Sequence, residues 1–258
     1  MISLASSFPS IAYRARGVIW RLLRHIGVYD DVSCLATLAP GLKLTQRAVN
    51  GFVHEIANSA ILRDTTAKYG RLSHDGITDW PMKLAATSRG AILLLYVLSR
   101  VVKPKVVIET GCFTGLYSSF ILYAMHLNGA GHLYSIDLPA QAGQFRLEWG
   151  LPDGVSPGFL VPEGLRHRWT LVIGNVRDEL MPLLSQLRQV DMFFHDSDHS
   201  YEHMMWEFTS IWPHLSRGGL LVSDDISLNT SFWDFSTAMG SAYVIHRSTA
   251  NLGALVKG

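Results

Sequence analysis

Four aspartates and one histidine follow two apolar, strand-like runs in the second half of the sequence. The runs are VDMFF (190–194) and GLLVSD (219–224), and the polar residues at their ends are Asp196, Asp198, His199, Asp224 and Asp225. Carboxylates crowded together repel one another unless a cation neutralises them, and oxygen ligands favour hard ions such as Mg²⁺, Mn²⁺ or Ca²⁺. A histidine beside them can act as a base near neutral pH, because its ordinary pKa is about 6.5. The pattern predicts a site that combines a metal with a base.

A glycine-rich turn in the segment VVIETGCFTGLYSSFIL (106–122) is suited to a charged ligand. Gly111 permits a sharp turn after the strand, and Gly115 lets the backbone approach a ligand closely. The amides that begin the following helix can bind an anionic group. The spacing lacks the third glycine of the dinucleotide fingerprint and the Lys-Ser/Thr ending of a P-loop. Twenty-two residues after Gly115, the next strand-like run ends in Asp137, an acidic residue placed to bind two ribose hydroxyls.

The sequence from Lys103 onward alternates strand-like runs with helix-forming segments, which predicts an α/β fold. The strand-like runs are 105–110, 132–137, 169–174, 190–194 and 219–224. The helical segments are 116–127, 141–149, 177–187 and 199–215, followed by a helix at 231–239 and two further strand-like runs at 242–247 and 251–257. We expect a mostly parallel sheet with helices on both faces and a C-terminal antiparallel element. The carboxyl ends of its parallel strands, where ligands bind, then bring the glycine turn and the aspartates together.

The glycine turn and the acidic end of the second strand resemble motif I and its successor in class I S-adenosylmethionine-dependent methyltransferases. The resemblance implies a Rossmann-like, doubly wound sheet that binds S-adenosylmethionine. Its methionine part would lie against Glu109, Gly111 and Gly115, with its carboxylate held by Ser118 and its ribose by Asp137. The segment GNVRDELMPLL, which begins at Gly174, resembles the family's turn on the adenine side. It implies that the adenine side of the site includes Asn175, Val176 and Arg177.

The aspartate and histidine cluster resembles that of the metal-dependent O-methyltransferases. The similarity extends to the catechol and caffeoyl-CoA type and is closer to the macrolide-sugar and rhamnosyl type, because histidine stands where the catechol type has lysine. It implies that Mg²⁺ or another divalent cation is held by Asp196, Asp224 and Asp225, and that His199 is the catalytic base. The implied acceptor is a hydroxyl of a sugar or glycoside, with a catechol-like molecule as the alternative. The resemblance covers Lys103 to about Ile226.

Other interpretations of the same residues stay open at this point. The glycine turn alone is also typical of an ordinary strand–helix connection, Asp198 of a helix cap, and His195 and His199 of structural histidines. Other functions on the same sheet are an NAD(P) oxidoreductase, a metal-dependent hydrolase and a non-catalytic binding module. The missing third glycine argues against the oxidoreductase. A hydrolase would not need the pair Ser118 and Asp137, and a binding module would have little reason to keep a full set of metal ligands and base.

The first hundred residues show helical patterns with few strand signals. We divide the chain into a helical N-terminal extension (1–102), which caps the site, faces the substrate or mediates dimerisation, and a catalytic domain (103–258). Residues 11–26 form an apolar stripe with arginines opposite, and residues 88–101 form a hydrophobic helix. We expect a homodimer. A long loop is predicted over 139–163, of the kind that covers a substrate.

The composition predicts a globular protein that does not bind nucleic acid. Hydrophobic residues make up 48% and charged residues 17% of the 258 residues, enough apolar side chain for a large core. The net charge of +1 lacks the basic excess of nucleic-acid-binding surfaces. Cys34 and Cys112 are interpreted as reduced thiols. With no basic segment before the first apolar stretch, and no apolar run longer than 91–98, we expect a cytoplasmic enzyme without a membrane span.

Overall fold

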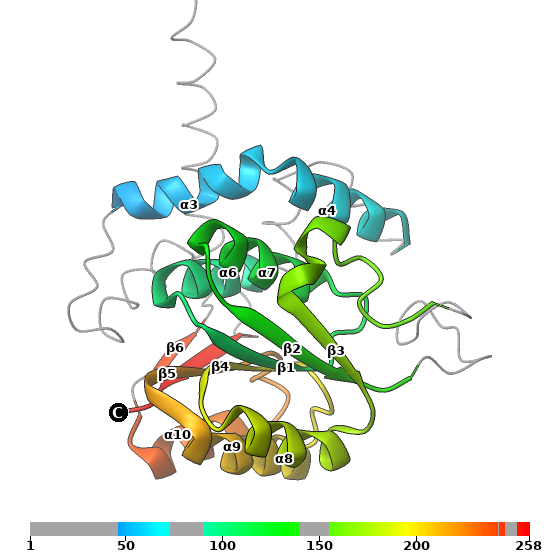
Figure 1. Cartoon of the computed structure of the whole chain (residues 1–258). Coiled ribbons are helices and arrows are strands. Elements are labelled where there is room, and N and C mark those ends of the chain that lie inside the picture. The colour runs from blue at the N-terminus through cyan, green and yellow to red at the C-terminus, as the bar shows by residue number, and fades with distance from the viewer. Residues whose placement is uncertain (1–45, 73–89, 140–154, 242, 246–251) are drawn as a thin grey trace, which may run out of the picture.

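The computed structural model describes residues 46–72, 90–139, 155–241, 243–245 and 252–258 of the chain, which build one seven-stranded sheet (Figure 1). Its order is β3-β2-β1-β4-β5-β7-β6. The strands are β1 (Val106–Thr110), β2 (His132–Asp137), β3 (Trp169–Ile173), β4 (Val190–His195), β5 (Leu215–Ser223), β6 (Tyr243–Ile245) and β7 (Gly253–Val256). Strands β1 to β5 pair in parallel, and β7 runs antiparallel to both β5 and β6. The predicted Rossmann-like sheet with its C-terminal antiparallel element is confirmed.

The direction of strand addition reverses between β1 and β4, so this pair forms the switch point of the sheet. From β1 the chain moves outward to β2 and β3, and β4 then returns to the other side of β1. Thr110 pairs with His195, so the two strands end level with each other. Crevices outside the carboxyl ends of strands at such a reversal are where open α/β sheets bind ligands.

Helices cover both faces of the sheet (Figure 1). One face carries α6 (Gly90–Val102) and α7 (Leu116–Asn128), and the other carries α8 (Val176–Leu187), α9 (Tyr201–Ile211) and α10 (Ser231–Met239). Successive residues of a strand point to opposite faces. Met192 and Phe194 therefore join the core under α6 and α7, whereas Phe193 joins the core under α8 to α10. Burial on both faces explains why β4 is a continuous apolar run rather than an alternating one.

Two further helices, α3 (Gln46–Asn58) and α4 (Ala60–Leu72), form an outer layer over α6 and α7 (Figure 1). Ile56 and Leu62 are buried in the same core as the sheet. Helices α3 and α6 are also joined by Glu55, which accepts hydrogen bonds from Tyr96 Oη and Arg100 Nε, both at 2.8 Å. The described part of the N-terminal hundred residues is thus helical. The amphipathic helix predicted at 11–26 lies outside the described residues.

Several element boundaries differ from the sequence-based expectation. The helix predicted over 199–215 ends at Ile211, a 3₁₀ turn η2 (Trp212–His214) follows, and β5 begins at Leu215 rather than at residue 219. Pro213 contributes to this, because proline has no N–H to continue the helical hydrogen bonds, although Trp212 before it keeps a helical backbone (φ −53°, ψ −44°). A second 3₁₀ segment, η1 (Glu163–Arg168), precedes β3. The helix predicted at 141–149 lies outside the described residues.

No helix within the described ranges combines the length and apolar character needed to cross a bilayer.

Candidate active site

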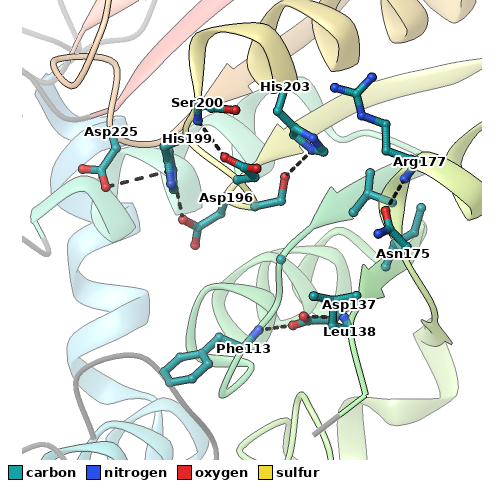
Figure 2. Close-up of a pocket in the computed structure, with 15 residues that line it drawn as sticks. Phe113, Asp137, Leu138, Asn175, Arg177, Asp196, His199, Ser200, His203 and Asp225 are labelled. Carbon is teal, nitrogen blue, oxygen red and sulfur yellow. Dashed lines mark hydrogen bonds and ion pairs between the residues drawn. The ribbon is translucent and has the colours of Figure 1, made fainter. Parts of the chain in front are cut away.

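A cavity of about 660 Å³ opens at the carboxyl ends of the strands (Figure 2). It is lined both by residues predicted to bind the cofactor and by residues predicted to bind the metal or act as the base. Eight predicted site residues line it: Gly111, Asp137, Asn175, Val176, Arg177, Asp196, His199 and Asp225. The lining does not include Glu109, Gly115, Ser118 or Asp224. Figure 2 shows Asp137 on one side of the cavity, and Asp196, His199 and Asp225 on another. The fold therefore brings the predicted ribose ligand and the predicted metal-and-base cluster into one space.

Gly111 joins the glycine turn to the acidic segment. Its φ is +79°, and a Cβ at this position would lie 2.0 Å from the carbonyl oxygen of Asp196. The Asp196 N–H in turn donates to Thr110 O at 2.9 Å. Any larger residue at 111 would have to displace the backbone of Asp196. The requirement for glycine here is thus set by close packing of β1 against the turn after β4, besides access for a ligand.

The Asp137 carboxylate is held by backbone amides. Its Oδ2 accepts from Phe113 N at 2.6 Å and its Oδ1 from Leu138 N at 2.7 Å, as Figure 2 shows. Phe113 has a left-handed φ of +46°, rare for a bulky residue, and this conformation accompanies the contact from its N–H. Burial raises the pKa of Asp137, and the two amides oppose that rise. One end of the cavity thus presents a fixed carboxylate.

The start of α8 forms another wall of the cavity. Asn175 caps this helix, its Oδ1 accepting from Arg177 N at 2.9 Å. The Arg177 guanidinium lies 4.3 Å from the centre of the Trp206 ring, a cation–π contact that orients the side chain at the rim. Val176 is buried except for 7% of its surface and gives this wall an apolar patch. This is the wall for which adenine contacts are predicted.

Glu109 and Ser118 lie beneath the glycine turn rather than in the cavity. Both are fully buried, and Ser118 Oγ donates to Glu109 Oε2 at 2.6 Å, as does Ser135 Oγ at 2.5 Å. Burial raises the pKa of Glu109 to about 7, although the two hydroxyls lower it. In this conformation Ser118 is committed to Glu109. Its predicted contact with a ligand carboxylate stays a prediction.

Gly115 is covered by a segment that the sequence analysis did not connect with it. Its φ is +84°, and a Cβ there would lie 2.8 Å from both Gly158 Cα and Val161 Cγ2. Gly158 N donates to Phe113 O at 2.7 Å, and Leu160 N donates to Thr114 O at 2.9 Å. The described end of the loop predicted over 139–163 is thus pinned to the glycine turn. The backbone that Gly115 admits closely belongs to the protein itself.

His199, Asp196 and Asp225 gather at the other end of the cavity (Figure 2). His199 Nε2 lies 3.8 Å from Asp196 Oδ1 and 4.0 Å from Asp225 Oδ2, too far for hydrogen bonds. This ring nitrogen is buried and has no hydrogen-bond partner among the described residues. Burial lowers the pKa of His199, as does neighbouring His195, while the charge of Asp225 opposes them. The arrangement favours a neutral imidazole with a free nitrogen facing two carboxylates.

Burial and mutual repulsion disfavour the charged form of two carboxyl groups in this cluster, Asp196 and Asp224. Burial and the charge of Asp224 raise the pKa of Asp196 well above its ordinary value. Burial and the charge of Asp225 raise the pKa of Asp224 to about 7, although Tyr117 Oη donates to Asp224 Oδ2 at 3.3 Å. Asp225 itself has a left-handed φ of +49°. Neutralisation by a cation would relieve this repulsion. In the part of the chain described, however, no three His, Cys, Asp or Glu side chains converge as a preformed metal site.

Asp198 is placed as a turn-forming residue. Its Oδ1 accepts from Ser200 N at 2.8 Å, and this bond lowers the pKa of Asp198. An aspartate that accepts from the amide two residues later forms an Asx turn, which here leads into α9. The interpretation of Asp198 as a helix-start residue agrees with this geometry.

The cavity also contains residues that the sequence analysis did not single out. They are Phe113, Ile136, Leu138, Ser197, Ser200 and His203. Leu138 is 51% exposed, an apolar side chain that follows Asp137 directly at the end of β2. His203 lies in the first turn of α9, four residues after His199, and its place at the start of the helix predicted over 199–215 was the signal that could have found it. Nothing in the local sequence marked Phe113, whose role depends on its backbone conformation.

Comparisons with known proteins find a related domain and related folds. Residues 108–226 match the family model described as a methyltransferase domain. No curated protein matches the chain in sequence. Among solved structures, the chain is similar to the O-methyltransferase TomG from Streptomyces achromogenes, involved in tomaymycin synthesis and in complex with S-adenosylmethionine. The identity is 20%, the match covers 78% of this chain and 91% of that one, and the TM-score is 0.51.

Two other solved structures share the fold. A methyltransferase from Podospora anserina, bound to S-adenosylhomocysteine, is 14% identical over 83% of this chain and 97% of its own, with a TM-score of 0.52. The TDP-rhamnose 3′-O-methyltransferase of calicheamicin biosynthesis is 17% identical over 78% and 96%, with a TM-score of 0.51. At these sequence identities the structural similarity establishes the fold alone. The match to a methyltransferase domain covers residues 108–226, the part of the chain that contains all the residues lining the cavity.

Proposed function

We propose that the chain transfers the methyl group of S-adenosylmethionine to a hydroxyl group, with help from a divalent cation. One observation carries this proposal: Asp137, at the end of β2, and the cluster of Asp196, His199 and Asp225 line the same cavity. The first is suited to a ribose, and the second is suited to activating an oxygen nucleophile. The match to a methyltransferase domain over 108–226 supports the choice of reaction.

The proposed reaction is a direct displacement. The acceptor oxygen attacks the sulfonium methyl in line with the departing sulfur, so an O–CH₃ bond forms as the S–CH₃ bond breaks. No covalent enzyme intermediate is required. Holding donor and acceptor in one cavity supplies much of the rate enhancement, because it removes the entropy cost of bringing two molecules together.

His199 is the proposed general base. Its Nε2 is buried, finds no hydrogen-bond partner in the described ranges of the chain, and faces the carboxylates of Asp196 and Asp225. A neutral ring with a free nitrogen can accept the hydroxyl proton, and the imidazolium that results would be stabilised by the two carboxylates. Burial lowers the pKa of His199, which keeps the ring in its basic form before the reaction.

The donor set is chemically suited to a divalent cation, although its side chains do not converge as a preformed site among the described residues. Asp196, Asp224 and Asp225 offer only oxygen atoms, and burial together with the charge of neighbouring aspartates raises the pKa of Asp196 and of Asp224. These three residues would hold Mg²⁺ or a similar hard ion. A cation bound there supplies Lewis-acid polarisation of the acceptor hydroxyl. The cation and its ligands are proposals that a metal-binding measurement must test.

The proposed acceptor is a hydroxyl of a sugar or glycoside. The support is the histidine at position 199, which resembles the sugar-modifying branch, and the name of one fold relative, a TDP-rhamnose 3′-O-methyltransferase. A catechol-like acceptor is the second candidate, because the carboxylate cluster suits any vicinal pair of hydroxyls. A cytoplasmic homodimer, with residues 1–102 as a helical extension that faces the substrate or the partner subunit, also belongs to the proposal. Light scattering at micromolar concentration tests the dimer, and a monomer mass would reject it.

Native mass spectrometry of the purified protein tests the central proposal. We expect bound S-adenosylmethionine or its demethylated product, followed by methyl transfer in a screen that contains glycosides and catechols. Calorimetry then compares S-adenosylmethionine with NAD and NADP. Tight binding of a nicotinamide nucleotide, with no heat from S-adenosylmethionine, would replace the methyltransferase proposal with an oxidoreductase.

A further inference from the structure

Glu207 is a fully buried carboxylate on α9, behind the wall of the cavity. Four side chains surround it. Its Oε2 lies 2.9 Å from Thr110 Oγ1 and 2.6 Å from His195 Nδ1, and its Oε1 lies 2.7 Å from Ser197 Oγ and 2.8 Å from His203 Nε2. A carboxylate that satisfies two partners with each oxygen has no capacity left for solvent or substrate. Its function must therefore act through the residues that it holds.

The hydrogen-bonding pattern fixes where the protons of two histidines lie. An ionised carboxylate only accepts hydrogen bonds, so the ring nitrogens that face it must carry hydrogen. Burial alone would raise the pKa of Glu207, but the charge of His195 and the bonds from His195, His203 and Ser197 lower it to about 2. An ionised Glu207 therefore requires hydrogen on His195 Nδ1 and on His203 Nε2.

The residues that Glu207 holds surround the proposed catalytic turn. His195 precedes Asp196 and Ser197 follows it, so both neighbours of this proposed metal ligand are tied to one carboxylate. Thr110, the third partner, accepts the Asp196 N–H at its backbone oxygen. The His195 ring also packs edge-on against the ring of His199, with 5.1 Å between ring centres and an angle of 73°.

We propose that Glu207 is a positioning residue for the proposed methyl transfer: it ties β1, β4 and α9 together and fixes the turn that carries Asp196 and His199. This role rests on the proposed function, because it assigns a purpose to the geometry of the cation ligand and the base. Glu207 does not touch the cavity, and its effect passes through His195 and Ser197. The hydrogen-bond assignment itself is independent of the reaction and can be measured in the free protein.

The first experiment reads the histidine tautomers by ¹⁵N nuclear magnetic resonance of the purified, cation-free chain. In the wild type we expect His195 with hydrogen on Nδ1 and His203 with hydrogen on Nε2. The amide introduced by Glu207→Gln has one end that donates, so one of the two rings must accept and move its proton to the other nitrogen. Unchanged tautomers for both rings in the variant would overturn the assignment.

The second experiment measures kinetics and cation affinity in the same variant. We expect Glu207→Gln to lower kcat and the affinity for Mn²⁺, each by roughly 10- to 100-fold, as is typical when a group that orients a metal ligand is changed. The KM for S-adenosylmethionine should stay within about twofold, since Asp137 and its amides are untouched. The matched control is Glu202→Gln, an exposed carboxylate at the start of the same helix, and it should behave as wild type. A folded Glu207→Gln protein with wild-type kcat and Mn²⁺ affinity would overturn the positioning role.

A milder pair of variants covers the case in which Glu207→Gln does not fold. Thr110→Val removes one donor with little change in volume, and Thr110→Ser restores it. We expect a several-fold loss of kcat in the first and recovery in the second, with Mn²⁺ affinity following the same order. Equal kcat and Mn²⁺ affinity in both variants and the wild type would overturn the proposal. A wild-type protein that binds neither cofactor nor cation would instead refute the proposed function, while the tautomers still decide the hydrogen-bond assignment.

Discussion

The two ends of the cavity differ in how far the chain itself satisfies their charges. At the Asp137 end, each carboxylate oxygen accepts a backbone N–H, from Phe113 and Leu138. At the other end, Asp196 and Asp225 stand 3.8 and 4.0 Å from His199 Nε2, and that nitrogen has no hydrogen-bond partner among the described residues. Backbone amides hold the Asp137 carboxylate in place before a ligand binds. At the other end the neighbouring carboxylates repel one another, and a bound ligand is needed to balance them. A binding end and a reacting end are expected to differ in this way.

Cation removal is the largest predicted perturbation, and it should affect only the acidic end. We expect EDTA to abolish turnover and Mg²⁺ to restore it, because Asp196, Asp224 and Asp225 repel one another without a cation. Binding of S-adenosylmethionine, measured by calorimetry, should persist, since Asp137 does not depend on the ion. Asp225→Ala should mimic EDTA and resist rescue at ordinary Mg²⁺ concentrations. Full activity of the cation-free enzyme would mean that the aspartates are structural.

Removal of the proposed base should separate proton transfer from cation binding within the acidic end. His199→Ala is expected to lower kcat by roughly 10²–10⁴-fold, the usual contribution of a positioned general base. Its Mn²⁺ affinity should remain, because the carboxylates are unchanged. Residual activity should rise with pH, as the acceptor hydroxyl ionises without help. A variant as active as the wild type would place the base elsewhere.

The site residues that the sequence could predict are those that follow regular strands. Asp137, Asp196 and His199 are marked by their place at the ends of strand-like runs, and parallel pairing brings such ends to one edge of the sheet. The apolar runs around them also predicted the strands, since burial on both faces leaves a continuous hydrophobic signal. Predictions tied to this repeating geometry therefore agreed with the fold.

Other features depend on contacts between distant segments, which one sequence does not reveal. Glu207 gains three of its four partners, Thr110, His195 and Ser197, only when β1, β4 and α9 assemble. The fourth, His203, lies one turn earlier on the same helix. Gly115 contacts Gly158, forty-three residues later, so the reason for its small size was not readable locally. The sequence analysis assigned both Ser118 and Glu109 to the cofactor, because it could not show that the Ser118 hydroxyl donates a hydrogen bond to Glu109.

A change at the Asp137 end should weaken cofactor binding and leave cation affinity intact, the reverse of the effect of EDTA. We expect Asp137→Ala to cost about 1–3 kcal/mol of binding free energy for S-adenosylmethionine, the value of a lost hydrogen bond to a charged group. This corresponds to a Kd weaker by roughly 5- to 150-fold, measurable by calorimetry. Asp137→Asn keeps the shape and serves as the matched control, with a smaller loss. Unchanged affinity in the alanine variant would remove Asp137 from the cofactor site.

The smallest predicted effect is that of Asp198→Ala, which tests whether Asp198 belongs to the cation site together with Asp196. Asp198 accepts from Ser200 N at 2.8 Å and belongs to the turn before α9, so we expect Asp198→Ala to lower the free energy of unfolding by about 0.5–1.5 kcal/mol. Mn²⁺ affinity and kcat should stay within about twofold of wild type, in contrast to Asp196→Ala.

The pH dependence of this difference in the free energy of unfolding provides a second test of the Asp198 prediction. The bond from Ser200 N lowers the pKa of Asp198 in the folded protein below its value in the unfolded chain. The stabilisation should therefore be complete above the unfolded pKa of about 3.9 and disappear as the pH falls through the folded pKa. Chemical denaturation of wild type and Asp198→Ala between neutral and acidic pH measures it. Loss of Mn²⁺ affinity in Asp198→Ala would instead make Asp198 a fourth carboxylate of the cation site, which would then extend from Asp196 into the turn before α9.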